Sequence, residues 1–255
     1  MIFSFDLDGT LIHSRRRLTE TPDVLPVEYR QEEPFGFMTQ GALDAFHALQ
    51  QRTVCLVNTL RGLEQARRVT FVADGSCRYT AVQNGLYLYR DGVLDADWAA
   101  RVARMVEELP VGLSDGVARV LSTLPGIECL SRQYEYMAVF FVTADFDDVL
   151  CALLAAELSR QGWALVRQRK KLYLHPLSVD KGSVLAHVQA LEQDAEALGF
   201  GDSFFDLPML RLCQRACAPG GCELEGGDWG LPLCFSQSPA QAGTEEVLRD
   251  ILNLI

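Results

Sequence analysis

Short apolar runs alternate with stretches of helical periodicity in the first and last thirds of the chain. Strand-length apolar runs cover residues 2–7, 53–57, 80–82, 197–200 and 233–235. Apolar residues recur at helical spacing over residues 41–51, 63–72 and 181–191, and two further helices are predicted to begin near residues 207 and 244. Strands that alternate with helices are typical of a parallel sheet covered by helices. The pattern therefore predicts an α/β fold. The polar residues 12–40, which include three prolines, are predicted to be irregular.

The middle of the chain has a different pattern. Apolar runs cover residues 86–89, 136–143, 164–168 and 171–175, and helical periodicity covers residues 95–109 and 146–160. Asp91-Gly92 is a hairpin-type turn signal. Strands and helices joined by hairpin connections indicate an α+β insert rather than more of the parallel sheet. We therefore predict an inserted domain over residues 86–170, which divides a core made of residues 1–85 and 171–255.

Composition and charge exclude some classes of partner. The chain of 255 residues has a net charge of −11, whereas nucleic-acid phosphates are bound by Lys and Arg, so we expect no nucleic-acid partner. No segment approaches the ~20 uncharged apolar residues of a membrane span. The first strand begins at residue 2, so we expect no signal peptide and a cytoplasmic protein. We expect a monomer or a weak homodimer.

Eight cysteines occur in the chain. Cys213, Cys217 and Cys222 form a cluster, with Cys234 further on, but the C-x-x-C pair that is common in zinc sites is absent. We therefore interpret the cysteines as reduced thiols of a cytoplasmic protein.

Two carboxylates one residue apart follow the first apolar run. Asp6 and Asp8 stand in the segment Asp-Leu-Asp-Gly-Thr-Leu, at a strand end where open α/β sheets place their chemistry. Like charges this close repel unless a cation lies between them or one is protonated. Magnesium is the natural cation, since it prefers oxygen ligands and tolerates carboxylates together with water and phosphate. Asp6 and Asp8 are therefore predicted Mg²⁺ ligands.

Further polar residues lie at other predicted strand ends or helix starts, and together they suit phosphoryl transfer. Asp6 can attack phosphorus, and Asp8 can protonate the leaving oxygen and then deprotonate water. Thr59 offers a hydroxyl and Lys181 a cationic donor to the phosphate. Asp202 would complete the magnesium site, and Asp206 would orient it or bind through water.

Taken in this order, the sites resemble the haloacid dehalogenase superfamily of phosphohydrolases along the whole chain. The matching segments are Asp6-x-Asp8-Gly9-Thr10, Thr59-x-Arg61, Lys181-Gly182 and Gly201-Asp202-x-x-x-Asp206. The long insert and Gln83-Asn84-Gly85 look like the Cof-type branch, which includes sucrose-phosphate and trehalose-phosphate phosphatases and phosphomannomutase. The resemblance implies a Rossmann-like core, an α/β cap domain and Mg²⁺-dependent hydrolysis through a phospho-aspartate on Asp6.

Two positions depart from the pattern of that superfamily. Leu60 stands where its second motif often has Gly, and Phe205 stands where its last motif often has Asn. Neither change touches the catalytic positions, so we expect activity to survive.

Candidate substrate contacts lie in two places. The resemblance implies that Arg61 and Asn84 face the substrate. Arg169 and Lys170 belong to the densest basic patch, which either reaches the phosphate or an acidic substrate group or is a solvated face. For the triplet Arg15-Arg16-Arg17, exposed loop charge is the favoured interpretation. For His13 and His175 we favour structural roles over substrate contacts.

The sequence therefore predicts a magnesium-dependent phosphatase acting on a small phosphate monoester, with a sugar phosphate as the favoured class. Two alternatives remain open. A phosphomannomutase-like phosphosugar mutase would return the phosphoryl group to the sugar. A regulatory protein that binds a phosphate ligand and turns over little would retain the pocket.

Overall fold

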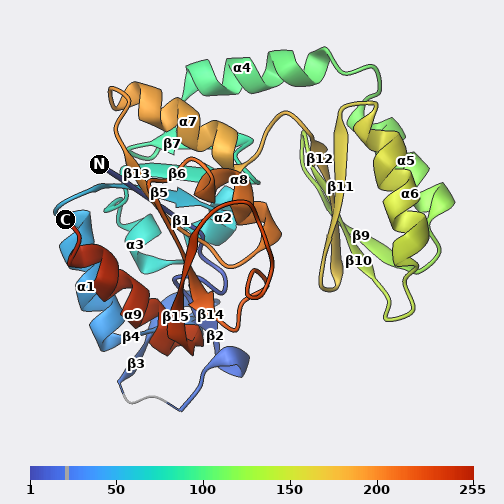
Figure 1. Ribbon diagram of the computed structural model, residues 1–255. Coiled ribbons are helices and arrows are strands. Elements are labelled where there is room, and N and C mark those ends of the chain that lie inside the picture. Colours follow the sequence, from blue (N-terminus) through green and yellow to red (C-terminus); the bar gives the residue numbers. More distant parts are fainter. Residues whose placement is uncertain (21–22) are drawn as a thin grey trace. The chain divides into compact units, whose positions relative to one another are not determined.

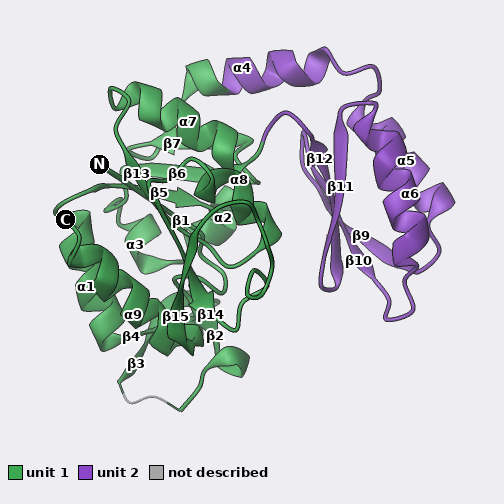
Figure 2. Cartoon of the chain, viewed as in Figure 1, with its two compact units in different colours: residues 1–98, 180–255 green, residues 99–179 purple. Residues whose placement is uncertain are grey.

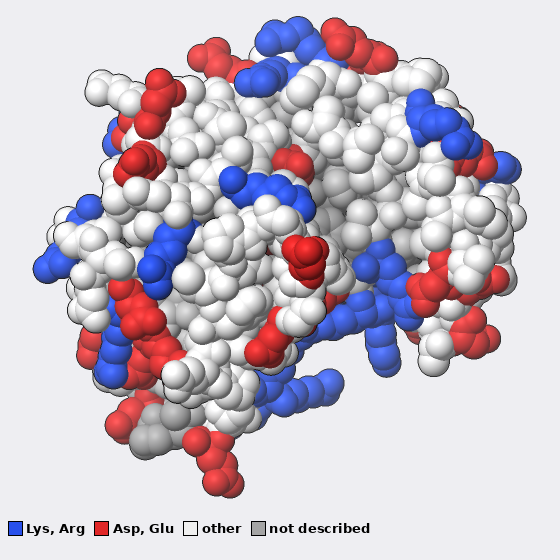
Figure 3. Space-filling view, viewed as in Figure 1, with Lys and Arg blue, Asp and Glu red and all other residues white. Residues whose placement is uncertain are grey.

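The computed structural model describes residues 1–20 and 23–255 (Figure 1). They form two compact units, coloured separately in Figure 2: unit 1 comprises residues 1–98 and 180–255, and unit 2 comprises residues 99–179. No helix in the described part of the chain is long and apolar enough to cross a membrane. Acidic and basic side chains are interspersed on the face seen in Figure 3.

Unit 1 is built on an eight-stranded sheet with the order β15-β14-β13-β1-β5-β6-β7-β8. The strands are β1 (Ile2–Phe5), β5 (Val54–Asn58), β6 (Tyr79–Val82), β7 (Tyr87–Arg90), β8 (Val93–Leu94), β13 (Ala197–Phe200), β14 (Arg215–Gly220) and β15 (Leu233–Pro239). From β15 to β6 every neighbouring pair is parallel, and β7 and β8 add an antiparallel edge. The predicted parallel-sheet α/β core is confirmed.

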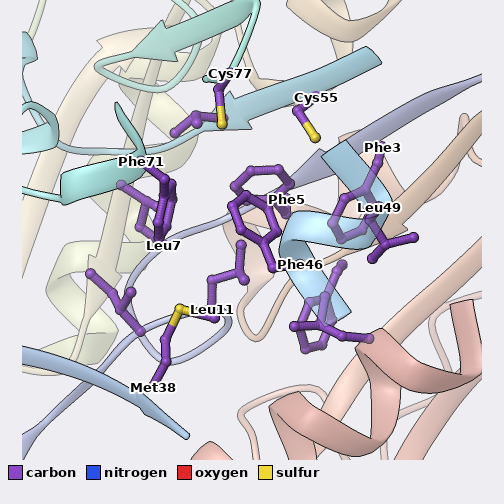
Figure 4. Packing of buried hydrophobic residues seen from close by; sticks show 14 of the residues in the cluster. Phe3, Phe5, Leu7, Leu11, Met38, Phe46, Leu49, Cys55, Phe71 and Cys77 are labelled. Atoms are coloured by element: carbon purple, nitrogen blue, oxygen red, sulfur yellow. The ribbon is translucent and has the colours of Figure 1, made fainter. Parts of the chain in front are cut away.

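The helices of unit 1 contribute apolar side chains to its core. They are α1 (Gln40–Gln50), α2 (Leu63–Ala66), α3 (Thr70–Ala73), α7 (Lys181–Leu191), α8 (Leu207–Leu210) and α9 (Ala240–Leu252). Figure 4 shows the core beside β1, where the ring centroid of Phe46 lies 5.3 Å from that of Phe5 and 4.7 Å from that of Phe71. The Phe5–Phe46 pair is edge-to-face, an arrangement that aromatic rings favour.

The helix predicted over residues 63–72 is divided into α2 and α3. Val69, between them, is extended (φ −80°, ψ 127°) and forms a β-bridge with Glu28. A residue engaged in a bridge to a distant strand cannot also continue a helix. The helix is therefore interrupted by pairing with a distant strand, which the helical periodicity of residues 63–72 does not predict.

The prediction of irregular structure over residues 12–40 is wrong for the described residues. A three-stranded sheet of order β2-β4-β3 forms there, from β2 (His13–Ser14), β3 (Val24–Arg30) and β4 (Glu33–Thr39), with a 3₁₀ turn at Arg15–Arg17. Residues 21–22 of this stretch lie outside the described residues. Pro26 lies in β3, which is an edge strand, and an edge strand tolerates a residue without an N–H.

The boundaries of the insert differ from the predicted residues 86 and 170. β7 pairs with β6, and β8 pairs with β7, so residues 87–94 extend the core sheet. At the other end β12 (Lys171–Pro176) pairs with strands of unit 2. Unit 2 therefore begins and ends later in the chain, at residues 99 and 179.

Unit 2 is an antiparallel sheet of order β11-β12-β10-β9 with helices. Its other strands are β9 (Ile127–Gln133), β10 (Ala138–Val142) and β11 (Trp163–Gln168); its helices are α5 (Leu113–Thr123), α6 (Asp148–Ser159) and most of α4 (Ala96–Glu107). Apolar side chains from sheet and helices, among them Phe140, Leu158 and Trp163, form one buried cluster. This is the predicted α+β type of insert, although α5 and β9 were not predicted.

Candidate active site

Three neighbouring parallel strands bring predicted site residues together. β1 lies between β13 and β5, and the residue after β1 is Asp6. Asp202 follows β13, and Thr59 follows β5. Because parallel strands end at the same edge of a sheet, residues that are 196 positions apart become neighbours. Asp6, Asp202 and Thr59 are all buried.

The ammonium group of Lys181 bridges two carboxylates in this site. Its Nζ lies 2.7 Å from Oδ1 of Asp6 and 2.7 Å from Oδ1 of Asp206, and its side chain is 1% exposed. Lys181 is the first residue of α7, where Asp180 caps the helix by accepting a hydrogen bond from Ser183 N. The Lys181 carbonyl accepts a hydrogen bond from Nδ2 of Asn58, at the end of β5. Helix start and strand end are thus fixed to each other.

Gly182 explains why α7 can lie so close to the site. A Cβ at this position would lie 2.6 Å from the carbonyl oxygen of Pro208 in α8. Only glycine permits this approach, so Lys181-Gly182 is a packing requirement as well as a source of charge.

Burial and charge act against each other at Asp6 and Lys181. Burial raises the pKa of Asp6 to about 7, and the neighbouring Lys181 limits the rise. Burial by itself would lower the pKa of Lys181, but Asp206 and Asp6 together raise it above its ordinary value. Lys181 therefore stays charged, and it stabilises the ionised form of Asp6.

Asp6, Asp202 and Asp206 form a buried acidic cluster that fits a small divalent cation. Each offers one carboxylate oxygen, and these oxygens lie within 4.8 Å of one another. The two oxygens of Asp206 are engaged within the protein, because Oδ1 accepts from Lys181 and Oδ2 accepts from Asp202 N (3.1 Å), Ser203 N (2.9 Å) and Ser203 Oγ (2.9 Å). Asp206 thus holds the backbone at Asp202 and Ser203. Asp6 and Asp202 could serve as direct ligands, and the predicted roles of the three residues at a metal stay predictions.

Phe205 does not disturb these hydrogen bonds. Its side chain is buried, and the donors to Asp206 come from Asp202, Ser203 and Lys181 instead. The departure from the superfamily pattern at Phe205 therefore leaves the position of Asp206 well defined.

Thr59 and Asn84 lie beside each other. The amide of Thr59 donates to the Ala81 carbonyl, and the amide of Asn84 donates to the Thr59 carbonyl at 3.1 Å. Gln83, Asn84 and Gly85 all have positive φ (52°, 62° and 89°), so the chain turns sharply at the end of β6. The turn explains the Gln-Asn-Gly sequence, since Asn and Gly tolerate the left-handed region best.

Asp8 lies outside the buried acidic cluster. Its side chain is 60% exposed and is held by Arg61, whose Nε lies 2.6 Å from Oδ2 and whose Nη2 lies 2.7 Å from Oδ1. Arg61 also pairs with Glu28 of β3, at 2.8 Å from Nη1 to Oε1. The assignments of Asp8 as a ligand and of Arg61 as a substrate contact stay predictions.

Glu28 and Arg17 are candidate functional residues that the sequence analysis did not favour for such a role. A Cβ at Gly9, which has φ 86°, would lie 2.4 Å from Oδ2 of Asp202 and 2.7 Å from Nη1 of Arg17. Arg17 therefore reaches the loop that follows Asp6, although loop exposure was the favoured interpretation. A clear apolar alternation in residues 12–40 would have predicted a strand and shown which of its side chains point inward. The prolines and charged residues of this stretch interrupt any such alternation.

His13 supports the same loop from behind. Its Nε2 lies 2.8 Å from Oγ1 of Thr244 in α9, and Thr244 Oγ1 donates to the Thr10 carbonyl at 2.5 Å. Because the single hydroxyl proton of Thr244 is used on Thr10, His13 must donate from Nε2. Burial lowers the pKa of His13 to about 4, which agrees with the structural role that the sequence favoured.

Arg169 and Lys170 belong to unit 2. They form the turn between β11 and β12, where Arg169 has φ 56° and its carbonyl accepts a hydrogen bond from Arg167. Both side chains are exposed. Their role in substrate binding stays a prediction.

Solved structures share this fold, although no family model and no curated protein matches the sequence. The sucrose-phosphatase of Synechocystis sp. PCC6803, solved with sucrose and phosphate, is 15% identical, with 98% of this chain and 97% of that chain covered and a TM-score of 0.68. The trehalose-6-phosphate phosphatase C-terminal domain of C. albicans is 12% identical (100% and 93% covered, TM-score 0.59). The Aspergillus fumigatus trehalose-6-phosphate phosphatase is 14% identical (100% and 93% covered, TM-score 0.58). The fold predicted from the motifs is confirmed.

Proposed function

We propose that this protein is a magnesium-dependent phosphatase that hydrolyses a small phosphate monoester through a phospho-aspartate on Asp6. The observation that carries the proposal is the arrangement around Lys181, whose ammonium pairs with Asp6 and Asp206 beside the carboxylate of Asp202. A lysine that keeps one oxygen of a buried carboxylate engaged leaves the second oxygen for attack on phosphorus.

The residues divide the chemistry as follows. Asp6 Oδ2 attacks phosphorus, the ester P–O bond breaks, and the leaving oxygen takes a proton from Asp8. Asp8 then removes a proton from water, which attacks phosphorus of the acyl phosphate; the bond between phosphorus and Asp6 breaks, and inorganic phosphate leaves. Thr59 and Lys181 donate hydrogen bonds to the phosphoryl oxygens, whose charge they stabilise in the transition state. Magnesium held by Asp6 and Asp202 would supply further positive charge to the phosphate.

A sugar phosphate is the substrate class that we favour. Structural neighbours named as sucrose-phosphatase and trehalose-6-phosphate phosphatases support this choice by analogy of fold. The strand ends provide charge for the phosphate and nothing that distinguishes one alcohol from another. Selectivity is therefore assigned to unit 2, with Arg169 and Lys170 as candidate contacts, and to the loop after Thr59.

The test is a panel of phosphate esters assayed with Mg²⁺ and with a chelator, for wild type and for Asp6→Asn. We expect phosphate release from at least one sugar phosphate, loss of release with chelator, and loss of turnover in folded Asp6→Asn, because an amide cannot form the phospho-enzyme. Substantial turnover by Asp6→Asn would refute the mechanism. An isomeric sugar phosphate as product would favour a mutase, and binding of phosphate without release from any ester would favour a regulatory protein.

A further inference from the structure

The three-stranded sheet inserted after β1 places one buried carboxylate, that of Glu28, against the guanidinium group of Arg61. Glu28 is 2% exposed. Its Oε1 lies 2.8 Å from Nη1 of Arg61, and its Oε2 lies 3.0 Å from Nη2. On the adjacent edge of the same guanidinium group, Nε and Nη2 hold the two oxygens of Asp8. Arg61 thus connects a buried carboxylate to an exposed one.

Every N–H group of the Arg61 guanidinium has an acceptor within the protein. A guanidinium has five such donors. Two point to Asp8 and two to Glu28, and the second hydrogen of Nη1 points to the carbonyl oxygen of Gln65 at 3.2 Å. In this arrangement Arg61 has no donor left for a substrate, so its influence on the reaction passes through Asp8.

The backbone holds Glu28 in place from two sides. Glu28 is opposite Gly36 of β4, and a Cβ at Gly36 would lie 2.6 Å from Oε2 of Glu28. On the other side Glu28 forms a bridge with Val69, and Tyr29 N donates to the Arg68 carbonyl at 3.3 Å. The space left by Gly36 and the bridge to Val69 fix the direction of the Glu28 side chain.

The exposed fractions of Arg61, Glu28 and Asp8 show that Asp8 is the side chain that needs a partner to fix its orientation. The side chains of Arg61 and Glu28 are 10% and 2% exposed, and that of Asp8 is 60% exposed. An exposed carboxylate on a loop samples several orientations unless a rigid partner holds it, and a bidentate guanidinium imposes one geometry. Glu28 holds the far side of that guanidinium with two hydrogen bonds, and the Gln65 carbonyl adds a third.

We infer that Glu28 is a positioning residue, which fixes the Arg61 guanidinium so that Arg61 holds the Asp8 carboxyl group in the orientation from which its protonated form gives a proton to the leaving oxygen. The inference rests on the proposed function for the role of Asp8. It assigns the sheet β2-β4-β3 a part in the reaction, and it assigns Arg61 to the positioning of Asp8 rather than to the substrate.

The kinetic test compares two esters of similar shape, phenyl phosphate and p-nitrophenyl phosphate, for wild type, Glu28→Gln and Glu28→Asp. p-Nitrophenolate leaves without a proton, whereas phenolate departure is assisted by one. The ratio kcat/KM includes steps up to leaving-group departure and excludes the later hydrolysis of the phospho-enzyme. We expect kcat/KM for phenyl phosphate to fall about tenfold in both variants, and that for p-nitrophenyl phosphate to change less than about twofold.

Glu33→Gln is the matched control, since Glu33 lies on the same sheet at an exposed position of β4. It should leave both esters unchanged. Equal losses for the two esters in the Glu28 variants would overturn the inference, because a general structural defect does not depend on the leaving group. No loss for either ester would also overturn it.

A crystal structure of Glu28→Gln supplies a readout that does not require activity. We expect the bidentate contact between Asp8 and Arg61 to be lost or replaced by several orientations of Asp8. An unchanged contact would overturn the inference even if wild type hydrolysed both esters. If wild type hydrolysed no ester with Mg²⁺, the proposed function would fail, while the orientation of Asp8 would still decide whether Glu28 positions it.

Discussion

The Nζ atom of Lys181 lies 2.7 Å from Oδ1 of Asp6, and both side chains are at least nine-tenths buried. The pair combines a residue that ends β1 with a residue that begins α7, 175 positions later in the chain. Removing one partner of a buried ion pair leaves an uncompensated charge. The free-energy cost of that charge is larger than the net stabilisation that the intact pair provides. The pair therefore links the stability of unit 1 to the chemistry proposed for Asp6.

Replacing Lys181 with Met should destabilise the protein by about 3–5 kcal/mol at pH 8, because Asp6 and Asp206 would then face each other without a cation. The cost should shrink between pH 8 and pH 5, because the pKa of Asp6 is already about 7 beside Lys181 and rises further without it, so Asp6 becomes protonated and neutral as the pH falls. Urea unfolding at both pH values measures this, with the exposed Lys170→Met as control. Equal stability of Lys181→Met and wild type at pH 8 would contradict the assignment of Lys181 as the counter-ion.

Asp202 and Asp206 should respond differently to magnesium. Asp202→Ala should remove most of the Mg²⁺-induced rise in Tm, because it deletes a direct ligand, and a ligand stabilises only the state that binds it. Asp206→Ala should lower Tm without Mg²⁺, because Lys181 would lose one of its two carboxylate partners and the amides of Asp202 and Ser203 would lose their acceptor. It should retain a clear Mg²⁺ response. Equal loss of the response in both variants would mean that Asp206 is a direct ligand as well.

His13 should make the protein less stable as the pH falls. Its folded pKa of about 4 lies below the ordinary value of 6.5, so between these values the unfolded chain binds more protons than the folded one. Stability should decline from pH 6.5 towards pH 4, by about 3 kcal/mol in total from this group. Unfolding free energies measured at pH 7, 6 and 5 should therefore fall less in His13→Asn than in wild type. Exposed His47→Asn, the control, should keep the wild-type slope.

Arg17→Gln should weaken binding of phosphate compounds. The Nη1 atom of Arg17 lies against Gly9 beside Asp202, where a guanidinium attracts a phosphate dianion. We expect KM for the best ester, and the inhibition constant of inorganic phosphate, to rise about tenfold while kcat changes little, since binding energy lost equally from ground and transition states appears in KM. Arg16→Gln, at an exposed neighbouring position, should change neither constant. A parallel loss in Arg16→Gln would show that only general charge is involved.

The core of the site could be predicted because its residues lie at the ends of recognisable elements. Asp6 follows a largely apolar strand, and Lys181 opens a periodic helix. Neither feature depends on a distant part of the chain. The insert could be recognised from its change of pattern, but its limits could not, because β12 begins as an apolar run that suits either sheet and only its partners β10 and β11 assign it.

By itself, the sequence determined the parallel sheet, because apolar strands that alternate with helices can form only a few kinds of fold. It also determined the edge of the sheet at which Asp6, Thr59 and Asp202 meet, because the carboxyl ends of parallel strands lie at the same edge. Only the tertiary structure decided that Glu28 points to Arg61 and that His13 meets Thr244, 231 positions away. In a polar strand that contains proline and register shifts, side-chain direction follows from the pairing partner rather than from the strand's own pattern. Glu28 became buried because β4 offers Gly36 opposite to it, and Arg61 supplies the charge without which that burial would be unfavourable.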